Sequence, residues 1–305
     1  MLLGHDERCR MTRRELLLTV AATPLWAAAD HAASRLTVEA YIFQQYAQRQ
    51  HKKLADVLPE VIPMARQAGF RNIELNAEFF APDLKDQTLN LVRQNHLMMP
   101  SVYSGGAMHE PELAAKTTER ALAIATICRS FGCTAVVCNA DPKGPGIEKS
   151  DAELAAQTVA LNHMGRVLSD AGFELRVHNH TPEMLSDARE WRHTLQHTDP
   201  KYVSLCLDLD WAHQGGQNPL GLLKEAGERV HEIHVRNSRD KLWLEDLEAG
   251  DVDYGAIATY LKAVGRKPLV VVELAYRENT TVSRPLGEDL SISRLYAEKV
   301  FGIKA

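Results

Sequence analysis

LCLDLD, residues 205–210, is a short apolar run that ends in carboxylates, and three similar runs accompany it: LRVHNHTPE (175–183), EIHVR (232–236) and VVVEL (270–274). Each run ends in a residue that can bind a metal or move a proton. Ionisable groups are rare inside such hydrophobic strands, because removing one from water costs several kcal/mol unless it is paired or bound to a cation. Four in succession, separated by helix-length segments, indicate one site built from the same end of neighbouring parallel strands.

The whole chain after residue 35 alternates between extended and helical patterns. The predicted strands cover 36–43, 71–76, 98–104, 134–140, 174–180, 203–209, 230–236 and 268–274, and the predicted helices cover 52–68, 83–95, 110–131, 150–171, 185–197, 218–227, 253–264 and 287–301. Eight strands alternating with eight helices predict an α/β fold of one domain, a (β/α)8 TIM barrel. A doubly wound open sheet is the alternative. It more often has a Gly-rich phosphate loop after its first strand, and residues 44–46 contain no glycine.

Alternation of side chains along the strands predicts which residues face the barrel axis. If the opposite faces pack under helices, Asp208, His234 and Glu273 all point inward near the C-terminal rim. Two carboxylates and an imidazole that converge with a fourth group suit one divalent metal ion, Mn, Zn, Co or Mg. Such an ion would polarise a carbonyl or hydroxyl group and stabilise a developing enediolate.

Several motifs together resemble the xylose isomerase-like TIM-barrel superfamily, and more closely its sugar phosphate isomerase/epimerase group. They are HNHTPE (178–183), LDLDW (207–211), GGQNP (215–219), HVR (234–236), GDVDY (250–254) and VEL (272–274). The resemblance implies a divalent metal held by Glu, Asp, His and Glu from strands five to eight. It also implies that the two glutamates are the acid/base pair, on opposite faces of the substrate.

The fifth strand departs from the family pattern. Many members end this strand with Glu, whereas this chain has His178, and its acid, Glu183, follows in the loop. We predict that Glu183 is a metal ligand and, with Glu273, a catalytic residue. His180 is the substitute ligand, and both His178 and His180 are predicted substrate contacts. The predicted metal ligands are therefore Glu183, Asp208, His234 and Glu273.

Three further residues are predicted to bind substrate. Arg236 follows His234 on the same face of its strand, Trp211 follows the LDLD run, and Glu74 faces inward on the second strand. Each has a structural alternative: a solvated rim charge for Arg236, core packing for Trp211 and a buried ion pair for Glu74.

The N-terminus has the parts of an export signal. The adjacent Arg13 and Arg14 precede an apolar run and then Ala27-Ala28-Ala29, which resembles a twin-arginine signal for exporting folded proteins. We predict a signal over 1–29 and a catalytic domain over 30–305, with a periplasmic location, or a cytoplasmic one if the signal is not used. A short amphipathic helix is the alternative. The run is too short to anchor the mature chain in a membrane.

Charge and cysteine content exclude other classes of protein. The net charge is −5 with acids and bases interspersed, and no basic stripe suggests nucleic-acid binding. The cysteines lack paired spacing and are interpreted as buried thiols. A small-molecule sugar is the expected partner, and a homo-oligomer remains open.

We therefore predict a metal-dependent isomerase or epimerase that acts on a small sugar or keto-sugar through proton abstraction and a metal-stabilised enediolate. A dehydratase or lyase acting on a keto-sugar or keto-polyol would use the same site. A non-catalytic sugar-binding barrel and an endonuclease-IV-like enzyme for abasic DNA are the other hypotheses, and the negative charge opposes the last.

Overall fold

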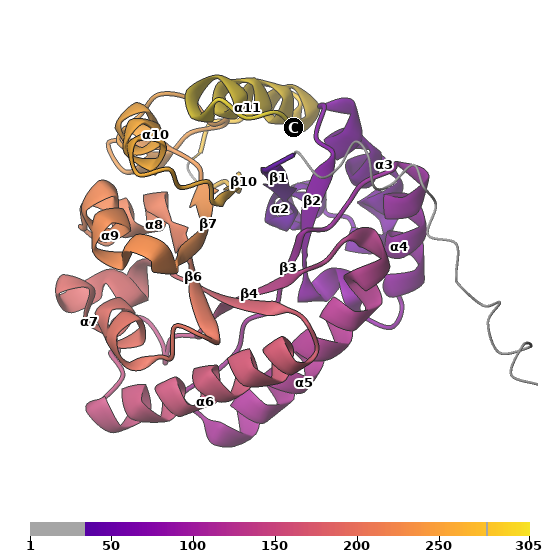
Figure 1. Cartoon of the computed structure of the whole chain (residues 1–305). Helices are drawn as coiled ribbons and strands as arrows, with labels where there is room; N and C mark the ends of the chain where they lie inside the picture. Colours follow the sequence, from indigo (N-terminus) through magenta and orange to yellow (C-terminus); the bar gives the residue numbers. More distant parts are fainter. Residues whose placement is uncertain (1–33, 279) are drawn as a thin grey trace, which may run out of the picture. The chain divides into compact units, whose positions relative to one another are not determined.

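The computed structural model describes residues 34–278 and 280–305. In this part of the chain, eight parallel strands close into a barrel in the order β1-β10-β7-β6-β5-β4-β3-β2 (Figure 1). The strands are β1 (Leu36–Glu39), β2 (Asn72–Asn76), β3 (Ser101–Tyr103), β4 (Ala135–Asn139), β5 (Glu174–His178), β6 (Val203–Asp208), β7 (Val230–Val235) and β10 (Leu269–Val272). The predicted (β/α)8 barrel is confirmed. The predicted export signal lies outside the described residues.

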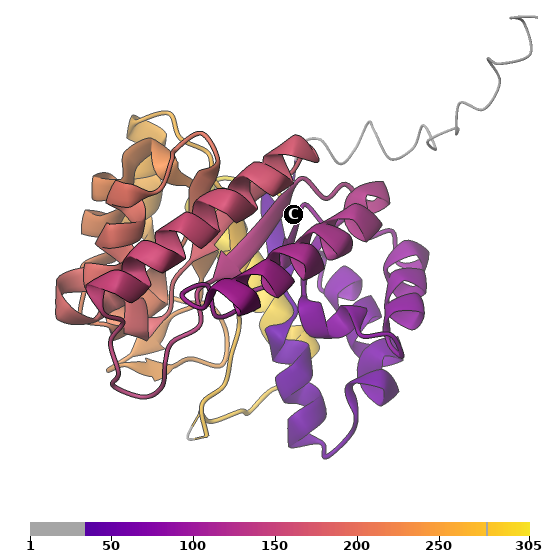
Figure 2. The ribbon, with the colours of Figure 1, turned by 90° about the horizontal axis from the view of Figure 1, so that it is seen from below.

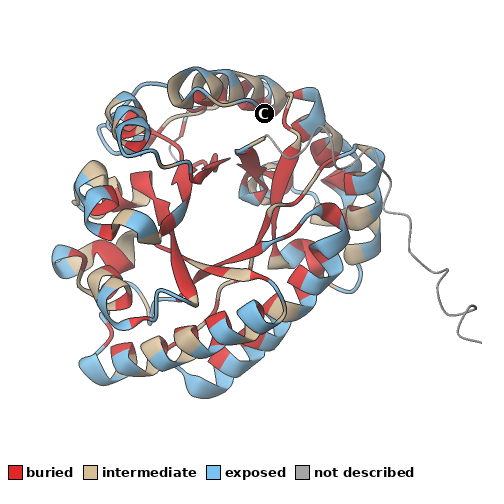
Figure 3. Cartoon of the chain, viewed as in Figure 1, coloured by how far each residue is buried: buried red, intermediate tan, exposed pale blue. Residues whose placement is uncertain are grey.

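A ring of helices surrounds the barrel. The helices are α2 (Tyr41–Arg49), α3 (Leu54–Gln67), α4 (Lys85–Gln94), α5 (Pro111–Cys128), α6 (Asp151–Asp170), α7 (Thr181–His197), α8 (Leu209–Gln214), α9 (Pro219–Ala226), α10 (Tyr254–Ala263) and α11 (Leu286–Phe301), with 3-10 turns at Ala77–Phe80, Arg129–Phe131 and Gly227–Arg229. Figure 3 shows buried strands inside helices whose outer faces are exposed. None of the helices within the described ranges is long and apolar enough to cross a membrane.

The two faces of each strand have different chemistry. Outward residues such as Val38 and Ile73 are fully buried in the apolar layer beneath the helices. Many inward residues are polar: the Nη1 of Arg176 donates to Oε2 of Glu232 at 2.6 Å, and the Glu232 side chain is fully buried while that of Arg176 is 12% exposed. Buried charges are tolerated when they are paired in this way. The barrel axis is therefore lined by a polar network, which continues upward into the site.

Two boundaries differ from the sequence-based prediction by four residues. The first strand ends at Glu39, not at residue 43, because α2 begins at Tyr41 and buries Ile42 and Phe43 on its inner face. Those apolar residues resemble a strand in sequence, but a carboxylate oxygen of Glu39 accepts from the Tyr41 N–H at 2.7 Å and marks the turn into the helix.

The helix after β5 begins at Thr181 rather than at residue 185, with a proline in its first turn. Two further elements had no counterpart in the prediction, namely helix α8 and a hairpin formed by β8 (Ser238–Arg239) and β9 (Leu242–Trp243). Figure 2 shows that this hairpin and the loop after β10 extend from the same end of the barrel. That end carries the candidate site.

Candidate metal centre and substrate cavity

Four buried side chains converge at the C-terminal ends of β5, β6, β7 and β10. Ligand atoms of His178, Asp208, His234 and Glu273 all lie within 4.8 Å of one another. The register explains the convergence, because Asp208 is paired with His234 across β6 and β7, and His234 is paired with Val271 of β10. The structure thus brings together three of the four predicted ligands, with His178 in the fourth place.

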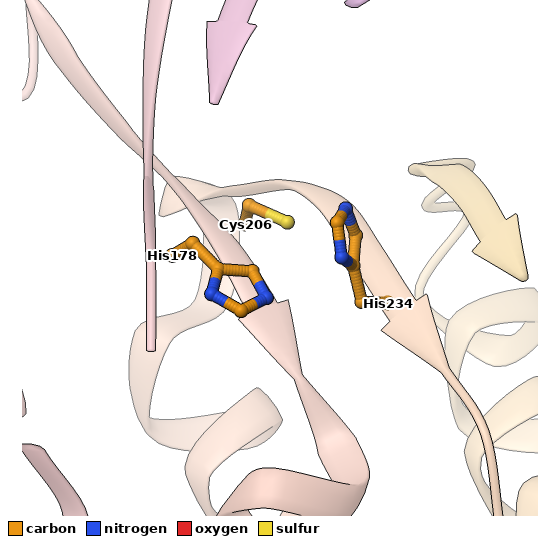
Figure 4. A group of neighbouring side chains, drawn as sticks. All are labelled: His178, Cys206 and His234. Carbon is orange, nitrogen blue, oxygen red and sulfur yellow. The ribbon is translucent and has the colours of Figure 1, made fainter. Parts of the chain in front are cut away.

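His178 is oriented toward this cluster. Its Nδ1 lies 3.3 Å from the hydroxyl of Tyr103 on β3. Its Nε2 lies 3.6 Å from Oε2 of Glu273 and 3.8 Å from Oδ2 of Asp208, and it has no hydrogen-bond partner among the described residues. Figure 4 shows the imidazoles of His178 and His234 approaching one another beside the thiol of Cys206. The outer nitrogen of His178 is thus held in place while the inner one is left free.

Both ring nitrogens of His234 face carboxylates. Its Nε2 lies 3.2 Å from carboxylate oxygens of Glu232 and Glu74, and its Nδ1 faces Oε2 of Glu273 at 2.6 Å. A carboxylate that receives the outer N–H of a histidine fixes the ring and raises its strength as a metal ligand. Two oriented imidazoles and two carboxylates are a suitable donor set for a borderline divalent cation such as Zn or Mn. The residues present therefore fit the metal that the sequence predicted.

Arg236 lies above this cluster and is not a solvated rim charge. Its side chain is 2% exposed, and it donates to Oε1 of Glu273 at 2.7 Å and to Oδ2 of Asp208 at 3.2 Å. The guanidinium also stacks on Trp211 and Trp243, 4.7 and 4.4 Å from the ring centroids. Burial opposes the ionisation of Glu273, but Arg236 and the two histidines outweigh it and hold the pKa of Glu273 well below its usual range.

Glu183 is placed elsewhere, at the start of α7. Its Oε2 accepts from the backbone N–H of His180 at 2.9 Å, and the His180 side chain accepts from the backbone N–H of Glu183, which forms a capping box. Glu183 is absent from the groups of described residues with converging ligand atoms. Burial and the nearby Glu190 carboxylate raise the pKa of Glu183 to about 7. Its role as ligand and base stays a prediction that the geometry does not favour.

A cavity of about 590 Å³ opens over the cluster. The residues that line it include Glu39, Tyr103, His180, Trp211, Arg236 and Glu273. Three of the predicted substrate contacts, His180, Trp211 and Arg236, thus line the cavity. His178 does not line it, but it lies next to Tyr103 and Glu273, which do. Burial, followed by the neighbouring His178, lowers the pKa of His180 to about 3, so its ring is neutral.

Glu74 lies below the cavity and does not line it. It is fully buried on β2, where it accepts a hydrogen bond from Ser101 and faces the outer nitrogen of His234. Burial and the Glu232 carboxylate raise the pKa of Glu74 to about 7. The structural alternative given for Glu74 is therefore the one that its position supports.

Sequence reasoning missed Glu39, the last residue of β1. It is 2% exposed and lines the cavity. Burial, Glu273 and Glu74 raise the pKa of Glu39 well above its usual range. The alternation in LTVE (36–39) could have indicated it, since Thr37 and Glu39 share a face opposite two apolar residues.

TIM-barrel enzymes place their active sites at the C-terminal rim of the barrel, and the candidate metal centre lies at that rim. The fold and the site together therefore indicate an enzyme of the TIM-barrel class. The chain belongs to the xylose isomerase-like TIM-barrel family, whose model matches residues 62–296. Inosose dehydratase from Geobacillus kaustophilus is 27% identical over 121 residues, which is 36% of this chain and 39% of that protein. The inosose dehydratase of Bacillus velezensis is 27% identical over 90 residues, 30% of each chain. The chain thus spans about a third of the length of these curated relatives.

Solved structures agree in fold over nearly the whole barrel. D-allulose 3-epimerase from Methylomonas sp. has a TM-score of 0.69 at 15% identity and covers 88% of this chain and 97% of its own. A sugar phosphate isomerase/epimerase from Parabacteroides distasonis has a TM-score of 0.68 at 19% identity, with 91% and 98% covered. At sequence identities of 15% and 19%, the similarity to these structures shows a shared fold. The chain is similar to sugar isomerases, epimerases and dehydratases.

Proposed function

We propose that the protein is a divalent-metal-dependent enzyme that removes a proton from a carbon next to the carbonyl of a small sugar or keto-sugar and thereby isomerises or epimerises it. The observation that carries the proposal is the convergence of His178, Asp208, His234 and Glu273, of which Glu273 also lines the cavity. A divalent ion held there would polarise the carbonyl oxygen and make the neighbouring C–H bond more acidic.

The side chains around the cluster supply the other parts of this chemistry. Glu273 has one oxygen held by Arg236 and one facing the histidines, so its carboxylate is ionised and positioned to accept a proton. The indoles of Trp211 and Trp243, whose ring centroids are 5.0 Å apart, offer an apolar surface for the C–H face of a sugar. Arg236, held between the two indoles and the carboxylates, would donate to a substrate oxygen.

Dehydration is the second candidate, and the matched relatives named inosose dehydratases favour it. It would begin with the same proton abstraction and would differ in the loss of a hydroxyl group from the next carbon. The residues of the metal cluster do not separate the two reactions.

The test is proton exchange in D₂O. Purified protein, stripped with a chelator and reloaded with Mn or Zn, is incubated with an inosose, with D-allulose and with a 3-keto-glucoside, and deuterium at the carbon next to the carbonyl is followed by NMR. We expect exchange with at least one compound only after metal is restored, and its loss in Glu273→Gln. Exchange that persists without metal and in the variant contradicts the proposed chemistry. Sugar binding without metal or exchange would instead support a binding protein.

A further inference from the structure

Glu39 and Glu273 occupy adjoining positions on the barrel wall. Strand β1 pairs in parallel with β10, with Val38 opposite Val272. Glu39 follows Val38 and Glu273 follows Val272, so the two glutamates come next to one another. Both glutamates line the same cavity. Two carboxyl groups therefore reach the cavity from one side, at the seam where the first and last strands close the barrel.

One carboxylate oxygen of Glu39 has no partner in the described part of the chain. Its Oε2 accepts from the Tyr41 N–H at 2.7 Å, whereas its Oε1 has no hydrogen-bond partner among residues 34–278 and 280–305. No ion pair to Glu39 is present in these ranges, and it belongs to none of the groups with converging ligand atoms there. The free Oε1 is thus available to a hydroxyl group of a substrate bound in the cavity.

The opposite wall carries imidazoles where the family resemblance implies an acid. The strand-five position is His178, and the ring of His180 follows it at a centroid separation of 4.8 Å. The nearest acid in sequence, Glu183, is held in the cap of α7. A substrate between these walls would meet carboxyl groups on the β10–β1 side and the imidazoles of His178 and His180 on the β5 side.

We propose that Glu39 is the second proton-transfer residue of the site, and that Glu273 and Glu39 act on the same face of the substrate in a syn elimination of water from a β-hydroxy ketone of the keto-polyol class. The inference rests on the proton abstraction of the proposed function and selects its second candidate, dehydration. Epimerisation requires proton transfer on both faces of one carbon, which two carboxyl groups on adjoining strands do not provide.

The elimination balances as follows. Glu273 takes the proton from the carbon next to the carbonyl, and that electron pair forms the new C=C bond. The C–O bond of the neighbouring hydroxyl breaks, and Glu39 gives its proton to the departing oxygen, which leaves as water. Glu273 then loses its proton to solvent and Glu39 regains one, so no oxidant or reductant is consumed.

The experiment compares two rates on one probe. An inosose is incubated with the metal-loaded full-length protein in D₂O, and both deuterium entry at the carbon next to the carbonyl and formation of the dehydrated product are measured. In Glu39→Gln we expect dehydration to fall by about 10²–10⁴-fold, the usual contribution of a general acid, while exchange stays within about threefold of wild type. In Glu273→Gln both rates should fall. A stereospecifically deuterated probe should show syn loss.

Thr37→Val is the matched control. Thr37 lies one inward position deeper on β1, is fully buried, has no hydrogen-bond partner for its hydroxyl in the described part of the chain, and does not line the cavity. The isosteric change keeps the strand packed, so both rates should stay at the wild-type value. Thermal unfolding checks that each variant is folded.

Other outcomes would overturn the inference in distinguishable ways. Dehydration in Glu39→Gln within threefold of wild type, or equal loss of exchange and dehydration in a folded Glu39→Gln, removes Glu39 as the acid. Anti loss, exchange without dehydration, or epimerisation of D-allulose by the wild type overturns the one-face assignment and leaves the proposed function standing. Absence of exchange with every probe overturns both.

Discussion

Nη1 of Arg236 lies 2.7 Å from Oε1 of Glu273, while Oε2 of the same carboxylate lies 2.6 Å from Nδ1 of His234. Glu273 is therefore shared between a permanent cation and the candidate metal centre. The guanidinium also contacts Asp208, the other carboxylate of the centre. Because a metal ion would bind beside this buried positive charge, Arg236 both holds the ligands in place and opposes the binding of a second cation.

Replacing Arg236 with Met tests this double role. Without metal, the variant leaves three buried carboxylates, those of Asp208, Asp210 and Glu273, without the guanidinium, and we expect a loss of about 3–5 kcal/mol of stability. Addition of Mn should then raise the melting temperature of Arg236→Met by more than it raises that of wild type, because the competing charge is gone. Differential scanning fluorimetry with and without Mn measures both effects. Arg239→Met, which removes an exposed arginine bonded to Glu248, is the control. A smaller metal-induced shift in Arg236→Met would contradict the argument.

The fourth ligand is decided by comparing His178→Ala with Glu183→Gln. His178 directs a free nitrogen at Asp208 and Glu273, whereas Glu183 is held by the backbone of His180. We expect His178→Ala to weaken Zn or Mn binding at least tenfold and Glu183→Gln to change it less than twofold, as measured by isothermal titration calorimetry. The opposite result would restore the ligand assignment made from the sequence.

Strand alternation predicted the inward positions of Asp208, His234 and Glu273, because each lies in or directly after a buried strand whose other face is plainly apolar. The same rule did not identify Glu39 as an inward residue, because β1 has only four residues and the helical Ile42 and Phe43 prolong its apolar pattern. Short strands that run directly into helices carry too few residues to show a period.

Glu183 shows a different limit of sequence patterns. Family likeness directs attention to any acid near the end of the fifth strand, but HTPE (180–183) also has the pattern of a helix start, with Pro in the first turn and Glu at the third position. Local capping and metal ligation require the same residue type. In the structure the carboxylate of Glu183 accepts from the backbone N–H of His180, and metal ligation by Glu183 stays a prediction.

The export signal remains a prediction from the sequence, and it is tested in a bacterial host. Changing Arg13 and Arg14 to Lys should retain the protein in the cytoplasm, because a twin-arginine signal depends on that pair. Cell fractionation and mass measurement of the N-terminus provide the readout, with a mature chain that starts after Ala29 expected for the unchanged signal. Equal export of the two forms would exclude the twin-arginine interpretation.

Stability should depend on pH through Glu183, whose pKa is raised from 4.5 to about 7 by burial and by Glu190. Between these values the folded protein binds more protons than the unfolded chain, so stability falls as pH rises through the window and the loss is complete above about 7. The shift corresponds to at most about 3.5 kcal/mol, at about 1.4 kcal/mol per pKa unit. Glu183→Gln keeps the cap but cannot ionise. The difference in free energy of unfolding between this variant and wild type should therefore shift in favour of the variant when the pH rises from 5 to 8.

Glu153 provides the matched control for that measurement. It occupies the same third position in the capping box of α6, but its side chain is 28% exposed, and hydrogen bonds from Lys143 and Ser150 lower its pKa to about 2. Its stabilising contribution is present above pH 4.5 and is lost as pH falls toward 2, the opposite sign to that of Glu183. Urea unfolding from pH 5 to 8 in the presence of a chelator should therefore show a flatter profile for Glu183→Gln and an unchanged slope for Glu153→Gln. An unchanged slope for Glu183→Gln would mean that the Glu183 carboxyl is already ionised in the folded protein, as a metal-directed ligand would be.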